Sequence, residues 1–70
     1  MTQTAQITGT VEYRAGDGPM QTIPKGPVEI VATALDATIS WQDGGLSNSA
    51  AVPIDEFQRY VAQGDIRLDG

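Results

Sequence analysis

Residues 37–64 read ATISWQDGGLSNSAAVPIDEFQRYVAQG, and this stretch decides the fold. From Ala37 to Gln42 apolar and polar residues alternate with the period of two that is typical of a half-buried strand. Asp43-Gly44 comes next, and this dipeptide readily adopts the positive φ angles of a tight hairpin turn. A hairpin centred there pairs Trp41 with Leu46, Ile39 with Asn48 and Ala37 with Ala50. We therefore expect two adjacent antiparallel strands.

The returning strand of this hairpin, Leu46 to Val52, is rich in serine and carries few large apolar residues. The side chains of a central strand pack against those of a strand on each side, so a central strand usually carries more apolar residues than this. The composition predicts that this strand lies at an edge, where its outer backbone groups are free to pair with another chain.

From Pro53 to Gly64 the spacing of apolar residues changes to that of a helix. Pro53 suits the first helical position, and Asp55 and Glu56 complement the positive end of the helix dipole. Gly64 suits the left-handed conformation that follows a helix C-terminus. We predict a helix near residues 53–63 that docks on the sheet through Ile54, Phe57 and Val61.

The first half of the chain also contains strand patterns. Residues 5–14 alternate with Ile7, Val11 and Tyr13 on the inward face, and Gly9 on that face permits a bend or a close approach by another segment. Residues 15–19, AGDGP, predict a hairpin turn into a short strand, Met20 to Ile23. The two prolines of residues 24–27 confine this strand to an edge or a loop.

Residues 28–42 allow two interpretations. In the first, Leu35-Asp36 is a two-residue loop between two strands, which places Ala32 opposite Ile39 and Ile30 opposite Trp41. In the second, Val28 to Gln42 is one continuous bent strand, because Leu35-Asp36 is a weak turn signal. Asp65 to Leu68 alternates again and predicts a short closing strand.

Together these patterns predict an α+β chain that is mainly β with one short helix, folded as a single domain over residues 1–70. We expect five to six antiparallel strands in a small, partly open, SH3-like or related barrel, with the helix before the last strand. Trp41 and Phe57 are expected in the core between sheet and helix.

The composition excludes several kinds of site. The chain contains no Cys and no His, so it lacks disulfides, a thiolate nucleophile, an imidazole base and the usual zinc ligands. Nine acidic and four basic residues give a net charge of −5, and the four cations are scattered, which disfavours nucleic-acid binding. The acidic residues do not have the spacing of a calcium loop. No run of apolar residues is long enough for a membrane span or a secretory signal.

These observations lead to the hypothesis of a non-catalytic, acidic, cytosolic interaction domain without a cofactor or bound metal. We expect it to bind a protein partner, for which a basic surface would complement the acidic charge, or to self-associate through an edge strand. The candidate contact residues are Tyr13, Tyr60, Leu46, Ser47 and Asn48. One alternative is a small inhibitor or accessory factor from a mobile element that blocks a nucleic-acid-binding site on its target. Another is an enzyme that uses carboxylates.

Overall fold

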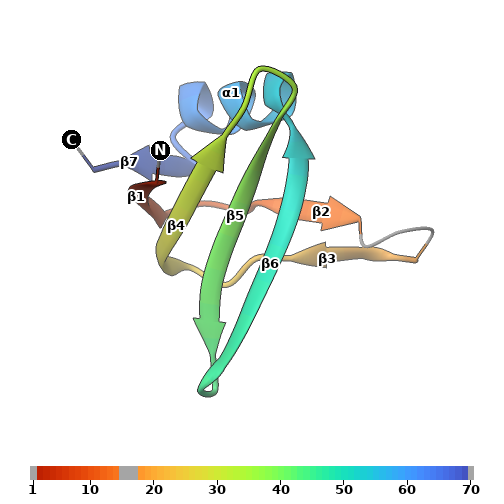
Figure 1. Ribbon diagram of the computed structural model, residues 1–70, viewed down its shortest axis with the longest axis vertical. Coiled ribbons are helices and arrows are strands. Elements are labelled where there is room, and N and C mark those ends of the chain that lie inside the picture. The colour runs from red at the N-terminus through yellow and green to blue at the C-terminus, as the bar shows by residue number, and fades with distance from the viewer. Residues whose placement is uncertain (1, 15–17, 70) are drawn as a thin grey trace.

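The computed structural model describes residues 2–14 and 18–69. Within these residues the chain forms seven strands and one helix: β1 (Thr2–Ile7), β2 (Glu12–Arg14), β3 (Met20–Thr22), β4 (Gly26–Ala32), β5 (Asp36–Asp43), β6 (Leu46–Pro53), α1 (Ile54–Gln63) and β7 (Ile66–Leu68). Five strands form one antiparallel sheet in the order β6-β5-β4-β1-β7, and β2 and β3 form a separate hairpin (Figure 1). The expected α+β class, mainly β with one short helix, is confirmed.

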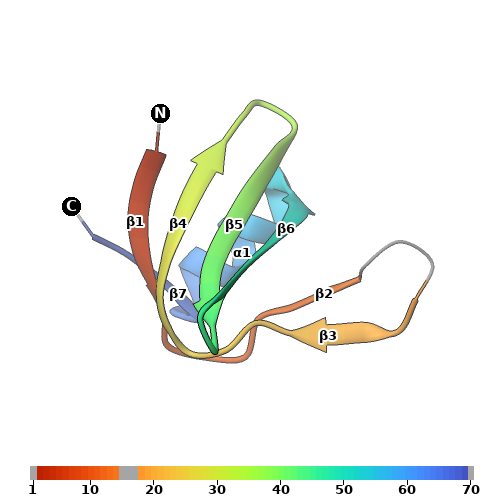
Figure 2. The ribbon, with the colours of Figure 1, turned by 60° about the horizontal axis from the view of Figure 1, so that its bottom comes forward.

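One face of the main sheet is covered and the other is open. Helix α1 and the β2–β3 hairpin lie on the same side of the sheet, and the opposite side faces outward (Figure 2). The inward side chains of all five main strands join Val11, Ile23 and Phe57 in one apolar cluster. The expected SH3-like barrel is not confirmed, because the sheet does not close: its edges in the described residues are β6 and β7.

The predicted first strand is divided between the two sheets. The division falls at Gly9, where the chain leaves β1 and turns toward β2. The backbone N–H groups of Thr8 and Gly9 both donate to the Asp65 carbonyl, at 2.8 and 3.1 Å. A Cβ atom on Gly9 would overlap the Asp65 carboxylate. The bend and close approach expected at this glycine are therefore both present.

The hairpin between β5 and β6 forms, but the predicted register is wrong. Gly44 and Gly45 occupy the two central turn positions, with φ angles of 59° and 85°. Both positions of this turn require positive φ, and two glycines meet the requirement with less strain than Asp43 and Gly44. Moving the turn by one residue moves every cross-strand partner by two: the observed pairs include Asp43 with Leu46, Trp41 with Asn48, Ile39 with Ala50, and Ala37 with Val52.

The segment from Val28 to Gln42 is two strands, β4 and β5, and not one bent strand. Their turn lies one residue earlier than the predicted Leu35-Asp36 loop. The Thr33 N–H donates to the Asp36 carbonyl at 2.8 Å and closes the turn around Ala34 and Leu35. The Thr33 hydroxyl also accepts the N–H groups of Leu35 and Asp36, each at 3.1 Å. Ile30 consequently lies opposite Ile39, and Ala32 opposite Ala37. A slip of two residues keeps the predicted inward faces unchanged.

Helix α1 follows the predicted bounds closely. Pro53 is the N-cap residue rather than the first helical residue, with ψ at 144°. Gly64 ends the helix in the left-handed conformation, and its N–H points to the carbonyls of Tyr60 and Val61. The N–H of Ile54, which has no partner inside the helix, donates to the Leu35 carbonyl at 3.0 Å. The turn between β4 and β5 thereby holds the start of the helix.

Trp41 is a core residue, as expected, with only 8% of its surface exposed. Its aromatic neighbour is Tyr13 on the β2–β3 hairpin: the ring centroids are 5.7 Å apart and the rings meet at 63°. This edge-to-face contact is a favourable arrangement for two aromatic rings. It joins the hairpin to the half of the sheet that contains β5 and β6.

Candidate functional site

Strand β6 is the most accessible backbone edge of the main sheet. Among the described residues it pairs with β5 on one side only. Asp43 and Leu46 close the two-residue turn, and such a closing pair exchanges both of its backbone hydrogen bonds. Since bonded and non-bonded pairs alternate along an antiparallel ladder, the backbone groups of Ser47, Ser49 and Ala51 point away from β5.

This edge lacks most of the features that prevent strand pairing in natural sheets. Exposed edges are usually short, or they carry charges, prolines or bulges. Strand β6 is eight residues long, and none of its residues from Leu46 to Pro53 is charged. Its single proline is the last residue. The edge therefore offers an uncharged track of backbone donors and acceptors up to Pro53.

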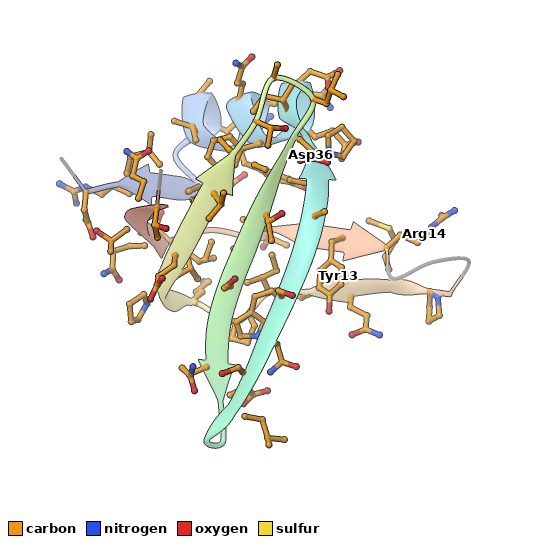
Figure 3. The ribbon with its side chains drawn as sticks, in the orientation of Figure 1. Tyr13, Arg14 and Asp36 are labelled. Atoms are coloured by element: carbon orange, nitrogen blue, oxygen red, sulfur yellow. The ribbon has the colours of Figure 1, made fainter. Side chains whose placement is uncertain are left out.

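The β2–β3 hairpin crosses beneath β6 and continues past its edge (Figures 1 and 3). The corner between them is a depression of about 310 Å³, which we call the hairpin groove. Its wall has apolar parts and charged parts, and it is lined by Glu12, Tyr13, Arg14, Met20, Ala51, Val52, Pro53 and Glu56. A strand added to β6 would lie above this groove.

The two tyrosines chosen from the sequence have different surroundings. Tyr13 is half-buried and lines the hairpin groove, where its hydroxyl donates to Gln21 Oε1 at 3.3 Å. The Tyr60 hydroxyl donates to the Glu12 carbonyl at 3.0 Å and accepts the Glu12 N–H at 3.4 Å. Tyr60 thus ties α1 to the residue before Tyr13, and it holds the hairpin in place without lining the groove.

The other three predicted contact residues lie together at the start of β6. Leu46, Ser47 and Asn48 are all exposed, and Leu46 has 71% of its surface accessible. Leu46 and Asn48 point to the same side as the buried residues of β6, whereas Ser47 points to the open face and accepts a hydrogen bond of 2.9 Å from the Gln42 amide. Asn48 is the cross-strand partner of Trp41, whose ring contacts Tyr13, but none of the three residues lines the hairpin groove.

Sequence reasoning missed Arg14 and Glu56 as neighbours of this edge. Met20 was assigned to an edge strand but not to the same site. The positions of Arg14 and Met20 depend on the bend at Gly9 and on the contact between Tyr13 and Trp41, which involve distant parts of the chain, whereas Glu56 is in the first turn of α1, directly after β6. Met20 is 49% exposed and lines the hairpin groove.

A second depression, of about 340 Å³, lies on the open face of the sheet. Its lining comes from β1, β4, β5 and β6 and from Asp69, and its accessible wall is more apolar than polar. The outward side chains here are hydroxyls, amides, Pro27 and the carboxylates of Glu29 and Asp69. The lining contains no Lys or Arg, and its aromatic residue, Trp41, is only 8% exposed. We regard β6 as the stronger candidate because its outward backbone groups can pair with an extended segment.

Other kinds of site find no positive support in residues 2–14 and 18–69. No group of three or more acidic residues converges there in a way that would hold a metal ion. None of the helical segments in that part of the chain is long and apolar enough to cross a membrane. Comparison with protein-family models, with curated proteins and with solved structures finds no match to this chain.

Proposed function

We propose that this chain is a non-catalytic interaction domain that binds an extended protein segment by strand addition to β6. The observation that carries the proposal is the uncharged, eight-residue edge strand with the outward backbone groups of Ser47, Ser49 and Ala51. Strand addition is a common mode of peptide recognition because any extended backbone supplies the complementary donors and acceptors. The absence of cysteine fits the reducing cytosol, where we place the domain.

The backbone alone provides a moderate affinity. Three outward residues offer about six ladder bonds to an antiparallel strand, and each is worth about 0.5–1.5 kcal/mol net of its exchange with water. Part of this gain is lost to the ordering of the incoming segment. Selectivity then depends on side chains, and the hairpin groove supplies an apolar surface at Tyr13 and Met20.

The alternative functions have no comparable support. A protein that mimics nucleic acid needs carboxylates gathered on one face. In the described residues they are spread over β2, β4, the two ends of β5, the first turn of α1 and both sides of β7. A carboxylate-based enzyme would need two acids near each other. Asp36 and Asp43, the most suggestive pair in the sequence, stand at opposite ends of β5.

The test is a selection of random ten-residue peptides, displayed on phage, against the immobilised protein. Binders are then measured against Ser49→Pro and against Ser49→Ala. Proline removes an outward N–H without breaking the ladder to β5, and alanine keeps that N–H. We expect at least about tenfold weaker binding to the proline variant, and a change within about twofold for the alanine variant.

Circular dichroism of both variants checks that β6 stays folded, and Ser47→Pro replaces Ser49→Pro if it does not. Peptides that bind the wild type and both proline variants equally would contradict strand addition at β6. A failure to select any peptide for the wild type would also count against the proposal.

A further inference from the structure

Resting on the proposed function, we infer that the strand received by β6 is the β6 strand of a second copy of this chain. The two strands pair antiparallel about a two-fold axis at Ser49, and the two main sheets join into one continuous sheet. Three features of the structure lead to this occupant: the positions of the outward backbone groups, an exposed leucine matched to the apolar part of the hairpin groove, and an arginine matched to an aspartate.

The backbone groups are arranged symmetrically. In a two-fold antiparallel pair, a residue on the axis faces its own copy. With the axis at Ser49, Ser49 faces Ser49 of the second copy, and Ser47 faces Ala51 on both sides. All three outward residues of each strand then lie in hydrogen-bonded positions, which gives about six ladder bonds. Registers displaced by two residues leave one outward residue of each β6 opposite Gly45 in the turn or opposite Pro53, which has no N–H to donate.

The same register gives a partner to the exposed leucine. Leu46 lies opposite Val52 of the second copy, and both side chains point to the covered side of the sheet. Val52 itself is only 2% exposed, and the accessible apolar side chains of the hairpin groove beside it are Tyr13 and Met20. Leu46 of the second copy therefore enters the groove, and Leu46 of the first copy enters the groove of the second. One contact covers two large apolar side chains that are 71% and 49% exposed in the single chain, Leu46 and Met20.

Charges near this contact are complementary. Asp43 is paired with Leu46 across the turn, and it lies on the covered side of β5 with Ile39 and Trp41. Arg14 is at the far end of β2, where the hairpin extends beyond β6 (Figure 3). When Leu46 of the second copy enters the groove, the Asp43 beside it approaches Arg14. The two-fold axis produces this pairing twice.

The net charge of −5 on each copy opposes association, but only weakly. Charges further apart than about 8 Å are largely screened at physiological ionic strength, and β6 itself carries no charge. Two strands and two leucine contacts make an interface at the small end of those that are stable. We therefore expect a micromolar rather than a nanomolar dissociation constant.

The first experiment is sedimentation equilibrium of the whole chain from about 1 to 500 µM, with Leu46→Lys and Leu35→Lys as matched variants. Leu35 is a suitable control because it is also a turn leucine, 82% exposed, at the opposite end of β5. We expect the wild type to dimerise, Leu46→Lys to raise the dissociation constant at least about tenfold, and Leu35→Lys to change it less than about twofold.

The second experiment tests the two-fold arrangement itself. Arg14→Asp and Asp43→Arg should each weaken the homodimer, because like charges then meet at both contacts. In an equimolar mixture, the Arg14→Asp copy has aspartate at positions 14 and 43, and the Asp43→Arg copy has arginine at both. Each contact between the two different copies then joins an aspartate to an arginine. We expect the mixture to form a heterodimer that is tighter than either homodimer by at least about tenfold.

The outcomes separate this inference from the proposed function. A protein that is monomeric at every concentration, yet binds peptides that Ser49→Pro weakens, overturns the dimer and leaves strand addition intact. A dimer that Leu46→Lys and Ser49→Pro do not affect uses another surface and overturns the inference. A mixture of the charge variants no tighter than either alone overturns the register at Ser49.

Discussion

The two edges of the main sheet are constructed differently. Strand β7 is three residues long, and its middle residue is Arg67, with Asp65 and Asp69 on either side. The segment around it is also fastened: the Asp65 carbonyl receives two N–H groups from the β1 side, and the Asp69 N–H donates to Thr4 at 3.1 Å. Strand β6 has eight residues and no charge.

This difference shows that the sheet is protected against added strands at one edge only. Short length and charged side chains are the usual means of protection, and β7 has both. An unprotected edge is a risk of aggregation unless something pairs with it. Under the proposed function, β7 completes the fold and β6 pairs with an added strand.

The largest effect should come from the packing that holds the hairpin under β6. Trp41→Ala removes a buried ring that contacts Tyr13 and should destabilise the fold by about 3–5 kcal/mol through the cavity left behind. A chain of this size has only about 4–10 kcal/mol in total. Urea unfolding followed by circular dichroism measures the change, with Leu35→Ala as a surface control. A cooperative transition close to that of the wild type would mean that the hairpin does not depend on Trp41.

An intermediate effect is expected on the β7 side. Gly9→Ala places a Cβ atom within 3.0 Å of the Asp65 Cα and into the Asp65 carboxylate. We expect a loss of about 1–3 kcal/mol from overpacking. Thermal unfolding of Gly9→Ala is compared with that of Gly9→Ala, Asp65→Ala, in which the overlapping carboxylate is gone. Equal losses in the two variants would show that the side chain of Asp65 is not the obstacle.

The smallest effect on folding should come from giving β6 the protection that β7 already has. Ser49→Lys adds an exposed charge whose side chain points to the open face. We expect a change of less than about 0.5 kcal/mol in stability, measured at concentrations where the chain is monomeric. Self-association and peptide binding should both fall, since a charge at the centre of the edge must be desolvated or displaced. Unchanged association would remove β6 from the interface.

The sequence predicted those elements whose signals are local. The helix ends at Gly64 because its φ of 85° suits glycine, and the acidic first turn and the apolar stripe were readable from spacing alone. The edge position of Leu46 to Val52 followed from composition and is confirmed. The errors in the two predicted registers also have local causes. The turn between β5 and β6 uses Gly44-Gly45 instead of Asp43-Gly44, and the Thr33 hydroxyl accepts backbone N–H groups within the turn between β4 and β5.

The remaining features depend on contacts between distant residues. Nothing near Gly9 indicates that Asp65, more than fifty residues later, sets the bend that divides β1 from β2. The hydrogen bonds between Tyr60 and Glu12 likewise join segments 48 positions apart. Leu46 could be identified as a candidate from the composition of its own strand. The hairpin groove could not, because the long-range contacts place the hairpin beneath β6.

The ends of the chain lie on neighbouring strands, as the bond between Asp69 and Thr4 shows (Figure 1). A bridge of a few residues, at about 3.3 Å each, would connect them and make the backbone circular. Cutting that circle between Ala34 and Leu35 would then yield a circularly permuted protein with new ends at the β4–β5 turn. Every strand neighbour would be retained in such a molecule.

Fusion tags on the present ends would be attached near β1 and β7, on the side of the sheet away from β6, and would leave the β6 edge uncovered.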